Sequence, residues 1–513
     1  MSTVVHATGP KAGLALLAAI LSLSFACARE APAPAGTPPA QAVPAATPGE
    51  AQAPIPGGQQ AARENVMRPW TGDLDGMIER RMIRVLTVYS KTGYFVDGGT
   101  QRGLIYEAFR LFEDDLNKAL ENKHIRVQVV LLPVSHGDLI PALLAGKGDI
   151  VAVGTLITDP RQEQVDFTDP TMTNVSAVAV TGPAAPPVNR VEDLAGREVY
   201  LRPSEVTPQG VERFNAELAR KGLPPAKLRP APEVLADEDI LEMVNAGLVG
   251  TTIAFEHIAT FWQQVLPKLV INKGAAVKTD GRIAWMIRKN SPKLKAELNA
   301  FLARYPAGSA ERNVLLQKYL KNLKFAKEAM SGSERAKLES TAAIFRKYGE
   351  QYSLDWLLMA AQGYQESQLN QNAKSAVGAI GVMQVMPATG KDMKVGDITQ
   401  IDPNIHAGVK YFRFMVDQYY KDEPMDRLNK GLFVFASYNA GPGRIRQLRK
   451  RAAERGLDPN KWFNNVEVIA AESIGRETVQ YVSNIYKYYL AYQLFMEQRD
   501  QRMKARQEIT GKK

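Results

Sequence analysis

The sequence predicts a multidomain protein with a two-lobed α/β domain over residues 70–325, followed by a mostly α domain over residues 335–500. As far as about residue 325, short apolar runs alternate with longer amphipathic ones, which is typical of βαβ units that form covered parallel sheets. Beyond residue 335, apolar residues recur at three- and four-residue steps and strand patterns nearly vanish, which indicates helices. A chain of 513 residues has room for about three such units.

The composition fits a soluble globular chain, with 45% hydrophobic and 23% charged residues, and excludes collagenous, coiled-coil and wholly disordered classes. The net charge of +10 favours an anionic polymer such as nucleic acid, lipid headgroups or cell wall, without choosing among them. Basic residues do not interleave with aromatic ones, so we expect no nucleic-acid partner. The five histidines lack ligand spacing and one cysteine cannot build a thiolate cluster, so we expect no metal and no cofactor.

Residues 1–27 are expected to be a signal peptide. Lys11 precedes an apolar run that ends in small residues and Cys27, and this pattern resembles bacterial lipoprotein signals, with an ordinary secretory signal as the alternative. The resemblance implies cleavage before Cys27 and lipidation there. In such lipoproteins an Asp after the cysteine is associated with inner-membrane retention. Here Ala28 follows, which implies the outer membrane, periplasmic face. Residues 28–69, rich in Ala and Pro, are expected to be a tether.

The first domain is expected to contain two lobes separated by a Pro-rich break at residues 182–187. Apolar runs predict strands, and apolar residues at helical spacing predict the helices between them. In the first lobe we expect strands at 83–89, 125–132 and 149–153 and helices at 104–116 and 138–145. In the second we expect strands at 198–201 and 251–255 and a helix at 208–221.

Three short segments of the first lobe carry a family resemblance. They read Gly-Lys-Gly-Asp at 146–149, Gly-Thr-Leu-Ile-Thr-Asp-Pro-Arg at 154–161 and Val-Asp-Phe-Thr-Asp-Pro at 165–170. Together with the order of strands and helices, they resemble the family-3 extracellular solute-binding proteins of amino-acid transport over most of residues 80–305. The resemblance implies a periplasmic-binding-protein-like fold with a ligand between the lobes.

The same resemblance implies ligand-binding residues. Arg161 stands where the family clamps a ligand carboxylate, which a guanidinium does with two charge-assisted hydrogen bonds. Glu256 falls near the acid for the ligand's ammonium, and Arg202 and Ser204 follow a strand that supplies further contacts. The implied ligand is an amino acid or peptide. Leu156 occupies a position that often carries a hydroxyl, so the ligand class stays open, as does the reading of Arg161 as a surface or inter-strand charge.

The second domain begins after a charged junction at residues 320–335. Ser353 is a candidate N-cap for the helix that carries Leu354, Leu357, Leu358 and Ala361. A late apolar stripe is expected to be core, and it consists of Tyr481, Ile485, Tyr488, Tyr492 and Phe495. Residues 501–513 are expected to be a basic tail, the solvated end of a helix.

Four ordered motifs stand in the second domain. They read Gln-Glu-Ser at 365–367, Ser-Ala-Val-Gly-Ala-Ile-Gly-Val-Met-Gln at 375–384, Ala-Ser-Tyr-Asn-Ala-Gly-Pro-Gly at 436–443 and Glu-Thr-Val-Gln-Tyr-Val at 477–482. In order and spacing they resemble family 1 lytic transglycosylases, relatives of goose-type lysozyme. The resemblance implies a lysozyme-like fold, peptidoglycan as substrate, and a lyase that cleaves the MurNAc-GlcNAc bond.

Glu366 is the predicted catalytic residue. It lies eight residues after Leu358, about 80° around a helix, and so at the edge of the apolar face. Partial loss of water raises the pKa of a carboxyl group, as a general acid near neutral pH requires. Asp392 and Asp397 lie outside the motifs and are read as solvated loop charges. Glycosidases usually need two carboxylates, whereas in the resembling family the substrate's acetamido group replaces one of them and a 1,6-anhydro product forms.

The resemblance also implies supporting roles in binding the substrate. Ser375 is placed to bind the acetamido group, and Gln384, Tyr438 and Asn439 to orient the sugar. As alternatives, Ser375 and Asn439 are turn or cap residues and Tyr438 is a core aromatic. The competing functions are a lysozyme-type hydrolase and a periplasmic solute-binding protein with a passive wall-binding domain. A ligand between the lobes that regulates the enzyme is a further hypothesis.

Overall fold

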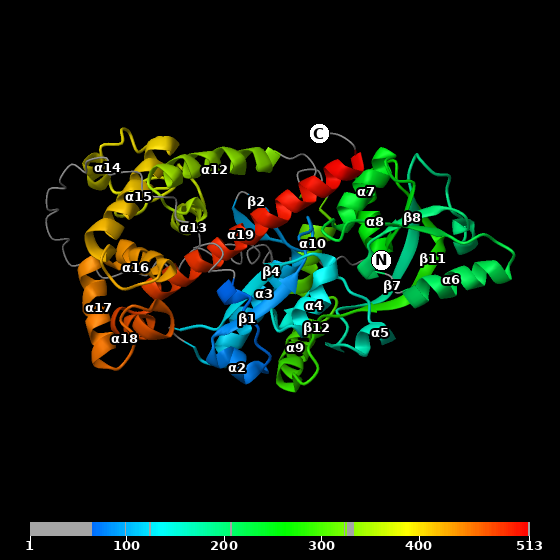
Figure 1. Cartoon of the computed structure of the whole chain (residues 1–513), viewed down its shortest axis with the longest axis horizontal. Helices are drawn as coiled ribbons and strands as arrows, with labels where there is room; N and C mark the ends of the chain where they lie inside the picture. The colour runs from blue at the N-terminus through cyan, green and yellow to red at the C-terminus, as the bar shows by residue number, and fades with distance from the viewer. Residues whose placement is uncertain are drawn as a thin grey trace, which may run out of the picture. The chain divides into compact units, whose positions relative to one another are not determined.

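The computed structural model describes residues 64–510 except 98, 123–124, 206–207, 323 and 326–332 (Figure 1). Cys27, the predicted signal peptide and most of the predicted tether lie outside the described residues. Within the described part, two α/β lobes precede a helical domain, so the predicted fold class is confirmed. No helix among the described residues is long and apolar enough to cross a membrane.

The first lobe is built on a five-stranded sheet in the order β4-β1-β5-β12-β6. Its strands are β1 (Met82–Thr87), β4 (Gln128–Pro133), β5 (Ile150–Val151), β6 (Asp166–Phe167) and β12 (Met286–Ile287). β1 pairs in parallel with β4 and β5, whereas β12 pairs antiparallel with β5 and β6. The predicted covered parallel sheet is therefore a mixed one, because β12 enters this sheet as the chain returns from the second lobe.

The helices of this lobe are α2 (Leu74–Glu79), α3 (Leu104–Ala119), α4 (Leu139–Leu144), α5 (Asp159–Gln162), α9 (Pro292–Arg304) and α10 (Ala310–Leu320). Of these, α2, α3 and α4 contact the sheet, α9 packs on α2, and α10 packs on α3. The buried face of α3 carries Phe109 and Phe112, which pack against Trp285 and Phe301 in the lobe's core. The predicted three- and four-residue apolar spacing thus positions α3 as expected.

The second lobe contains a five-stranded sheet in the order β11-β7-β10-β8-β9. Its strands are β7 (Met172–Thr181), β8 (Glu198–Leu201), β9 (Lys227–Pro230), β10 (Thr251–Phe255) and β11 (Val270–Ile283), and its helices are α6 (Pro208–Arg220), α7 (Asp237–Ala246) and α8 (Glu256–Gln263). The antiparallel pair β7 and β11 carries the chain between the lobes, with Met172 paired to Ile283 where both strands meet the first lobe.

The third part is mostly α, as predicted. Its helices are α12 (Ser333–Gln351), α13 (Trp356–Ser367), α14 (Pro387–Met393), α15 (Ile401–Met415), α16 (Arg427–Ala440), α17 (Pro442–Glu454), α18 (Glu467–Ile474) and α19 (Arg476–Thr510). α13 begins at Asp355, whose carboxylate accepts the Leu357 N–H, and not at Ser353, which has a left-handed φ of 52°. The N-cap prediction was thus wrong by two residues.

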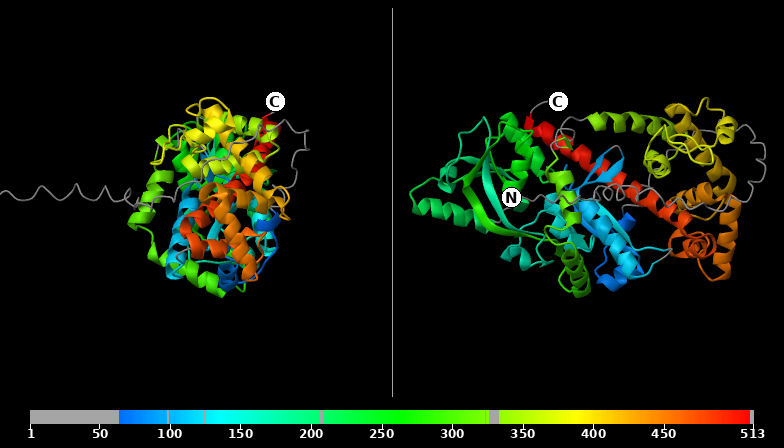
Figure 2. Two further views of the ribbon diagram at one scale, coloured as in Figure 1. Left: turned by 90° about the vertical axis from the view of Figure 1, so that its left-hand side faces the viewer. Right: turned by 180° about the vertical axis from the view of Figure 1, so that it is seen from behind.

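The last helix, α19, belongs to two parts of the molecule (Figures 1 and 2). It starts in the helical domain and ends against α7 of the second lobe, where Arg502 and Arg506 form ion pairs with Asp239. Ala505 is buried in the apolar core of that lobe. The expectation of a solvated basic tail was therefore wrong for Arg502 and Arg506, because buried acids of the second lobe neutralise them.

Candidate functional site

Glu366 lies in the last turn of α13, where α13 packs against α19. Its side chain is half-buried, and Oε1 accepts a hydrogen bond of 2.5 Å from the Tyr481 hydroxyl of α19. The apolar face of α13 holds the helix in the core, with Leu357 and Met359 buried about two and a half and two turns before Glu366. The catalytic candidate is thus carried on a fixed element at the edge of the core, as the helical spacing predicted.

Burial raises the pKa of Glu366 to about 7, against the opposing effect of the Tyr481 hydrogen bond, which favours the ionised carboxylate. A carboxyl group with a pKa near the surrounding pH can give up and take back a proton, which suits general acid and base work at one residue. The role of Glu366 as catalytic acid/base stays a prediction, and a carboxyl group with this pKa is suited to it.

Tyr438 and Asn439 end α16 beside this carboxyl group. Tyr438 donates from its hydroxyl to the Met383 carbonyl at 3.0 Å, and burial and the charge of Glu366 raise its pKa well above the usual value. Asn439 is exposed, and its Oδ1 accepts a hydrogen bond of 2.6 Å from the Thr478 hydroxyl of α19. The third and fourth motifs thus meet next to the first.

The second motif forms a loop whose polar side chains bond within it. Ser375 Oγ accepts the Ala379 N–H at 2.9 Å. Gln384, at a left-handed φ of 44°, donates its side-chain amide to the carbonyls of Ala373 and Gly381 at 3.3 and 2.9 Å. The bond of Ser375 supports the alternative interpretation of this residue as a turn residue. The bonds of Gln384 likewise hold the loop together. Their roles in sugar binding stay predictions.

Two further contacts fix the loop to the helices. Ser367, the residue after Glu366, donates from Oγ to the Val382 carbonyl at 2.9 Å. Gly381 has a φ of 76°, and a Cβ there would lie 2.5 Å from the Asn404 amide nitrogen. A side chain at position 381 would therefore push the loop away from α15, which explains the glycine in the motif.

A second carboxylate does not accompany Glu366 in the described part of the chain. Asp392 and Asp397 are exposed, as predicted, and Asp397 accepts hydrogen bonds from the Thr399 N–H and hydroxyl. The pKa of Glu366 depends on its burial and on Tyr481, and no other acid contributes. A site that retains configuration through a protein nucleophile needs a partner carboxylate about 5 Å away, and no Asp or Glu of the described chain is among the groups that shift the pKa of Glu366.

Tyr481 is the site residue that the sequence reasoning missed. It belongs to the apolar stripe that is expected to be core, and the residue is indeed only 7% exposed. Its hydroxyl, however, bonds to Glu366. The fourth motif, residues 477–482, already contained this tyrosine and was the available signal.

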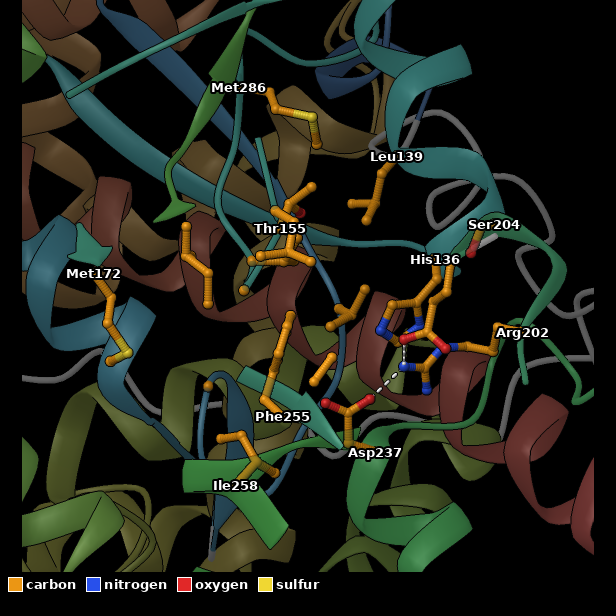
Figure 3. A pocket seen from close by; sticks show the side chains of 18 of the residues that line it. His136, Leu139, Thr155, Met172, Arg202, Ser204, Asp237, Phe255, Ile258 and Met286 are labelled. Carbon is orange, nitrogen blue, oxygen red and sulfur yellow. Dashed lines mark hydrogen bonds and ion pairs between the residues drawn. The ribbon is translucent and has the colours of Figure 1, made fainter. Parts of the chain in front are cut away.

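The two lobes enclose a cavity of about 1110 Å³, which both of them line (Figure 3). Arg161 reaches across it, donating to the Leu156 carbonyl of its own lobe at 3.1 Å and to the Ser204 carbonyl of the other at 3.2 Å. Ser204 also bonds to Glu233 through its hydroxyl at 2.6 Å. The structure thus brings Arg161 and Ser204 together at the cavity, and their contacts with a ligand stay predictions.

Arg202 is buried in the wall of this cavity and is neutralised by its own lobe. Its guanidinium pairs with Asp237 and Glu205 and donates to the Leu235 carbonyl at 2.8 Å. Burial and the charge of Arg202 lower the pKa of His136, which faces it from the first lobe, to about 3. Figure 3 shows His136, Arg202 and Asp237 pointing toward one another. His136 and Asp237 were not predicted, because neither belongs to a motif.

Glu256 does not line the cavity. Its carboxylate forms an ion pair of 2.7 Å with Lys273. The expectation that it faces a ligand was therefore wrong, since Phe255 at the end of β10 and Ile258 in the first turn of α8 point into the cavity instead. Among the described residues, no cluster of three or more His, Cys, Asp or Glu side chains could hold a metal ion.

Two family models match the chain. Residues 343–460 match the Transglycosylase SLT domain, a range that includes Glu366, Ser375, Gln384, Tyr438 and Asn439 but not Tyr481. Residues 85–322 match the bacterial extracellular solute-binding proteins, family 3, and this range includes the cavity residues.

Curated relatives and a solved structure are also similar to this chain. Proteins named "Membrane-bound lytic murein transglycosylase F" are similar in Desulfosudis oleivorans (26% identity, covering 79% of this chain and 89% of the relative) and in Actinobacillus succinogenes (27% identity, covering 83% and 88%). A structure of holo ArgBP from T. maritima covers 48% of this chain and 99% of its own, at 21% identity and a TM-score of 0.37. The chain thus joins a family-3 extracellular solute-binding domain to a Transglycosylase SLT domain, and over most of its length it is similar to proteins named membrane-bound lytic murein transglycosylase F.

Proposed function

We infer that this chain is a peptidoglycan lytic transglycosylase. The observation that carries the inference is Glu366, a half-buried carboxyl group that is bonded to Tyr481 and has a pKa raised to about 7, with no acid of the described residues contributing to that shift. The SLT match around Glu366 and the relatives named lytic murein transglycosylase support the same activity.

We propose a substrate-assisted mechanism with Glu366 as the one acid/base. Protonated Glu366 gives its proton to the glycosidic oxygen as the MurNAc–GlcNAc bond breaks, while the acetamido oxygen of MurNAc attacks the anomeric carbon. The Glu366 carboxylate then removes the proton of the C6 hydroxyl, and the C6 oxygen displaces the acetamido oxygen to close a 1,6-anhydro ring. No water is consumed, and Glu366 ends protonated, ready for the next bond.

The test is mass spectrometry of muropeptides released from purified sacculi by residues 63–513, beside Glu366→Gln. We expect products one water lighter than hydrolytic ones, absent with Glu366→Gln. Reducing-end products would instead establish a lysozyme-type hydrolase. Release of nothing by the wild-type chain would favour a solute-binding protein with a passive wall-binding domain.

We also propose that the cavity between the lobes binds an amino acid or peptide through a carboxylate on Arg161. In this arrangement the ligand replaces the Ser204 carbonyl as the partner of the guanidinium. Melting temperatures of residues 63–513 with and without amino acids and muropeptide-derived peptides test this. Arg161→Ala is expected to abolish ligand stabilisation, whereas Glu256→Gln, outside the cavity, is expected to keep it. Stabilisation that survives Arg161→Ala would refute the clamp.

A bound ligand has a route to the enzyme domain. α7 carries Asp237, which lines the cavity, and Asp239, which forms an ion pair with Arg502 of α19. We therefore propose that ligand binding changes the rate of sacculus cleavage, which the same assay measures with and without a stabilising ligand. An unchanged rate at saturating ligand would exclude regulation.

We propose that Cys27 is lipidated and anchors the chain to the outer membrane, facing the periplasm. The sequence around Cys27 and the "membrane-bound" name of the relatives support this. Cys27→Ser is expected to move the protein from the membrane fraction to the soluble fraction. Density-gradient separation of the two membranes then tests the choice of the outer one, and co-sedimentation with the inner membrane would contradict it.

A further inference from the structure

A buried glutamine, Gln362, lies next to Tyr481, the hydrogen-bond partner of Glu366. Gln362 stands one helical turn before Glu366 on α13, so both side chains project from the same face of the helix. Gln362 is 0% exposed. Its amide nitrogen lies 3.4 Å from the Tyr481 hydroxyl oxygen, and its amide oxygen has no hydrogen-bond partner among the described residues.

Packing alone does not account for this side chain. A buried acceptor without a partner costs about 1–3 kcal/mol, and native structures contain few of them. The buried positions of α13 before Gln362 are apolar, and they are Leu357, Met359, Ala360 and Ala361; Gly363 and Tyr364 are the buried positions after it. An apolar side chain of similar volume would fill the same space at lower cost, so the polar group of Gln362 calls for another role.

The single hydroxyl hydrogen of Tyr481 determines which residue donates in the hydrogen bond between Gln362 and Tyr481. A phenol has one hydrogen to donate, and Tyr481 donates it to Glu366 Oε1 in the 2.5 Å hydrogen bond. Tyr481 can therefore only accept from Gln362, which must turn its amide nitrogen toward the phenol. This donation favours the ionised phenol and so lowers the pKa of Tyr481, opposing burial. A hydrogen-bond chain of this kind strengthens each of its members.

We propose that Gln362 is a positioning residue that acts through Tyr481: it keeps the hydroxyl hydrogen of Tyr481 directed at Glu366 Oε1. The proposal rests on the proposed acid/base role of Glu366. Without the amide, the phenol can turn its proton elsewhere, and the carboxylate of Glu366 loses part of its stabilisation.

The consequence for catalysis can be read in the pH profile. The titratable groups that face Glu366 are Tyr481 from α19 and Tyr438 from α16, and among described residues no charged side chain shifts its pKa. Glu366 must be protonated to start the reaction, so activity falls as pH rises through its pKa. A weaker bond from Tyr481 raises that pKa and moves the alkaline limb to higher pH.

The test is a double-mutant cycle in residues 63–513 with Gln362→Met, Tyr481→Phe and the combination. Initial rates of anhydro-muropeptide release are measured from pH 5 to 9 at several substrate concentrations. For Gln362→Met we expect kcat to fall about two- to three-fold, KM to stay unchanged, and the alkaline midpoint to rise by about 0.3–0.5 pH units. Added to Tyr481→Phe, the same change is expected to do nothing. Equal shifts in both backgrounds, or none in the wild-type background, would overturn the proposal.

The chain offers a matched control for the loss of a buried amide. Both side-chain amide atoms of Gln493 on α19 are buried without a partner in the described chain. Gln493→Met is expected to leave the pH profile unchanged, and if it moves the midpoint equally, the effect of Gln362 is general. If Gln362→Met does not fold, Gln362→Leu replaces it.

A second readout does not need turnover. The melting-temperature difference between each variant and its Glu366→Gln counterpart changes with pH around the pKa of Glu366. Its midpoint should rise for Gln362→Met and stay unchanged if the proposal is wrong. An inactive wild-type chain would refute the proposed function and still leave this test of Gln362.

Discussion

Replacing Glu366 by Gln should stabilise the protein while it abolishes cleavage, and the gain should depend on pH. The pKa of Glu366 is raised from 4.5 to about 7 by burial. Between these values the folded chain binds the proton more tightly than the unfolded chain does. Rising pH therefore costs the wild type stability and costs the neutral amide none. The advantage of Glu366→Gln is absent below about pH 4.5 and complete above about pH 7.

The size of the effect follows from the shift. At 1.36 kcal/mol per unit, the full change corresponds to about 3 kcal/mol. Glu366 is only half-buried, so solvent screening reduces this to about 1–2 kcal/mol. For a domain of 150–250 residues, this predicts a melting-temperature gain of roughly 2–8 °C.

The assay is differential scanning fluorimetry of residues 63–513 and the Glu366→Gln variant from pH 4.5 to 8.5. The variant should melt with the wild type at the acid end and above it at the alkaline end. A difference that is constant across this range, or largest at low pH, would refute the reasoning that burial raises the pKa of this carboxyl group.

Two further substitutions test contacts that hold the site and the domains. Arg502→Ala should destabilise the full chain by about 2–4 kcal/mol, because it removes a partner of the buried Asp239. As a control, Lys450→Ala breaks the exposed ion pair with Glu454 and should change stability by less than about 0.5 kcal/mol. Equal losses of stability for Arg502→Ala and Lys450→Ala in thermal melts would contradict this prediction. Ser367→Ala should lower kcat about ten-fold and stability by about 1 kcal/mol, since it frees the Val382 carbonyl from α13. Unchanged initial rates would show that the loop holds without this bond.

The sequence predicted those parts of the molecule that depend on local pattern. β8 and β10 run over the expected residues, and the position of Glu366 at the edge of an apolar face follows from helical spacing alone. The antiparallel β12 could not be predicted, because its direction is set by the chain's return from the second lobe.

The errors in the candidate sites have a common physical cause. Tyr481 and Arg502 lie on one long helix, α19. The apolar stripe and the basic tail of this helix follow from its residue spacing, but the spacing does not show which groups the helix packs against. Glu256 was placed by alignment with a family position, whereas the direction of its side chain depends on the pairing with Lys273. Partners distant in sequence decided each case.

The path of α19 affects how this protein can be divided for study. Tyr481 and Arg502 stand roughly 32 Å apart on the helix at 1.5 Å per residue, and they serve different domains. Expression of the solute-binding lobes alone would uncover the apolar surface of the second lobe that Ala505 covers, and a C-terminal truncation of the enzyme would remove the same cover. Ligand-binding and enzymatic measurements therefore belong on one intact chain, with any purification tag placed at the N-terminal side.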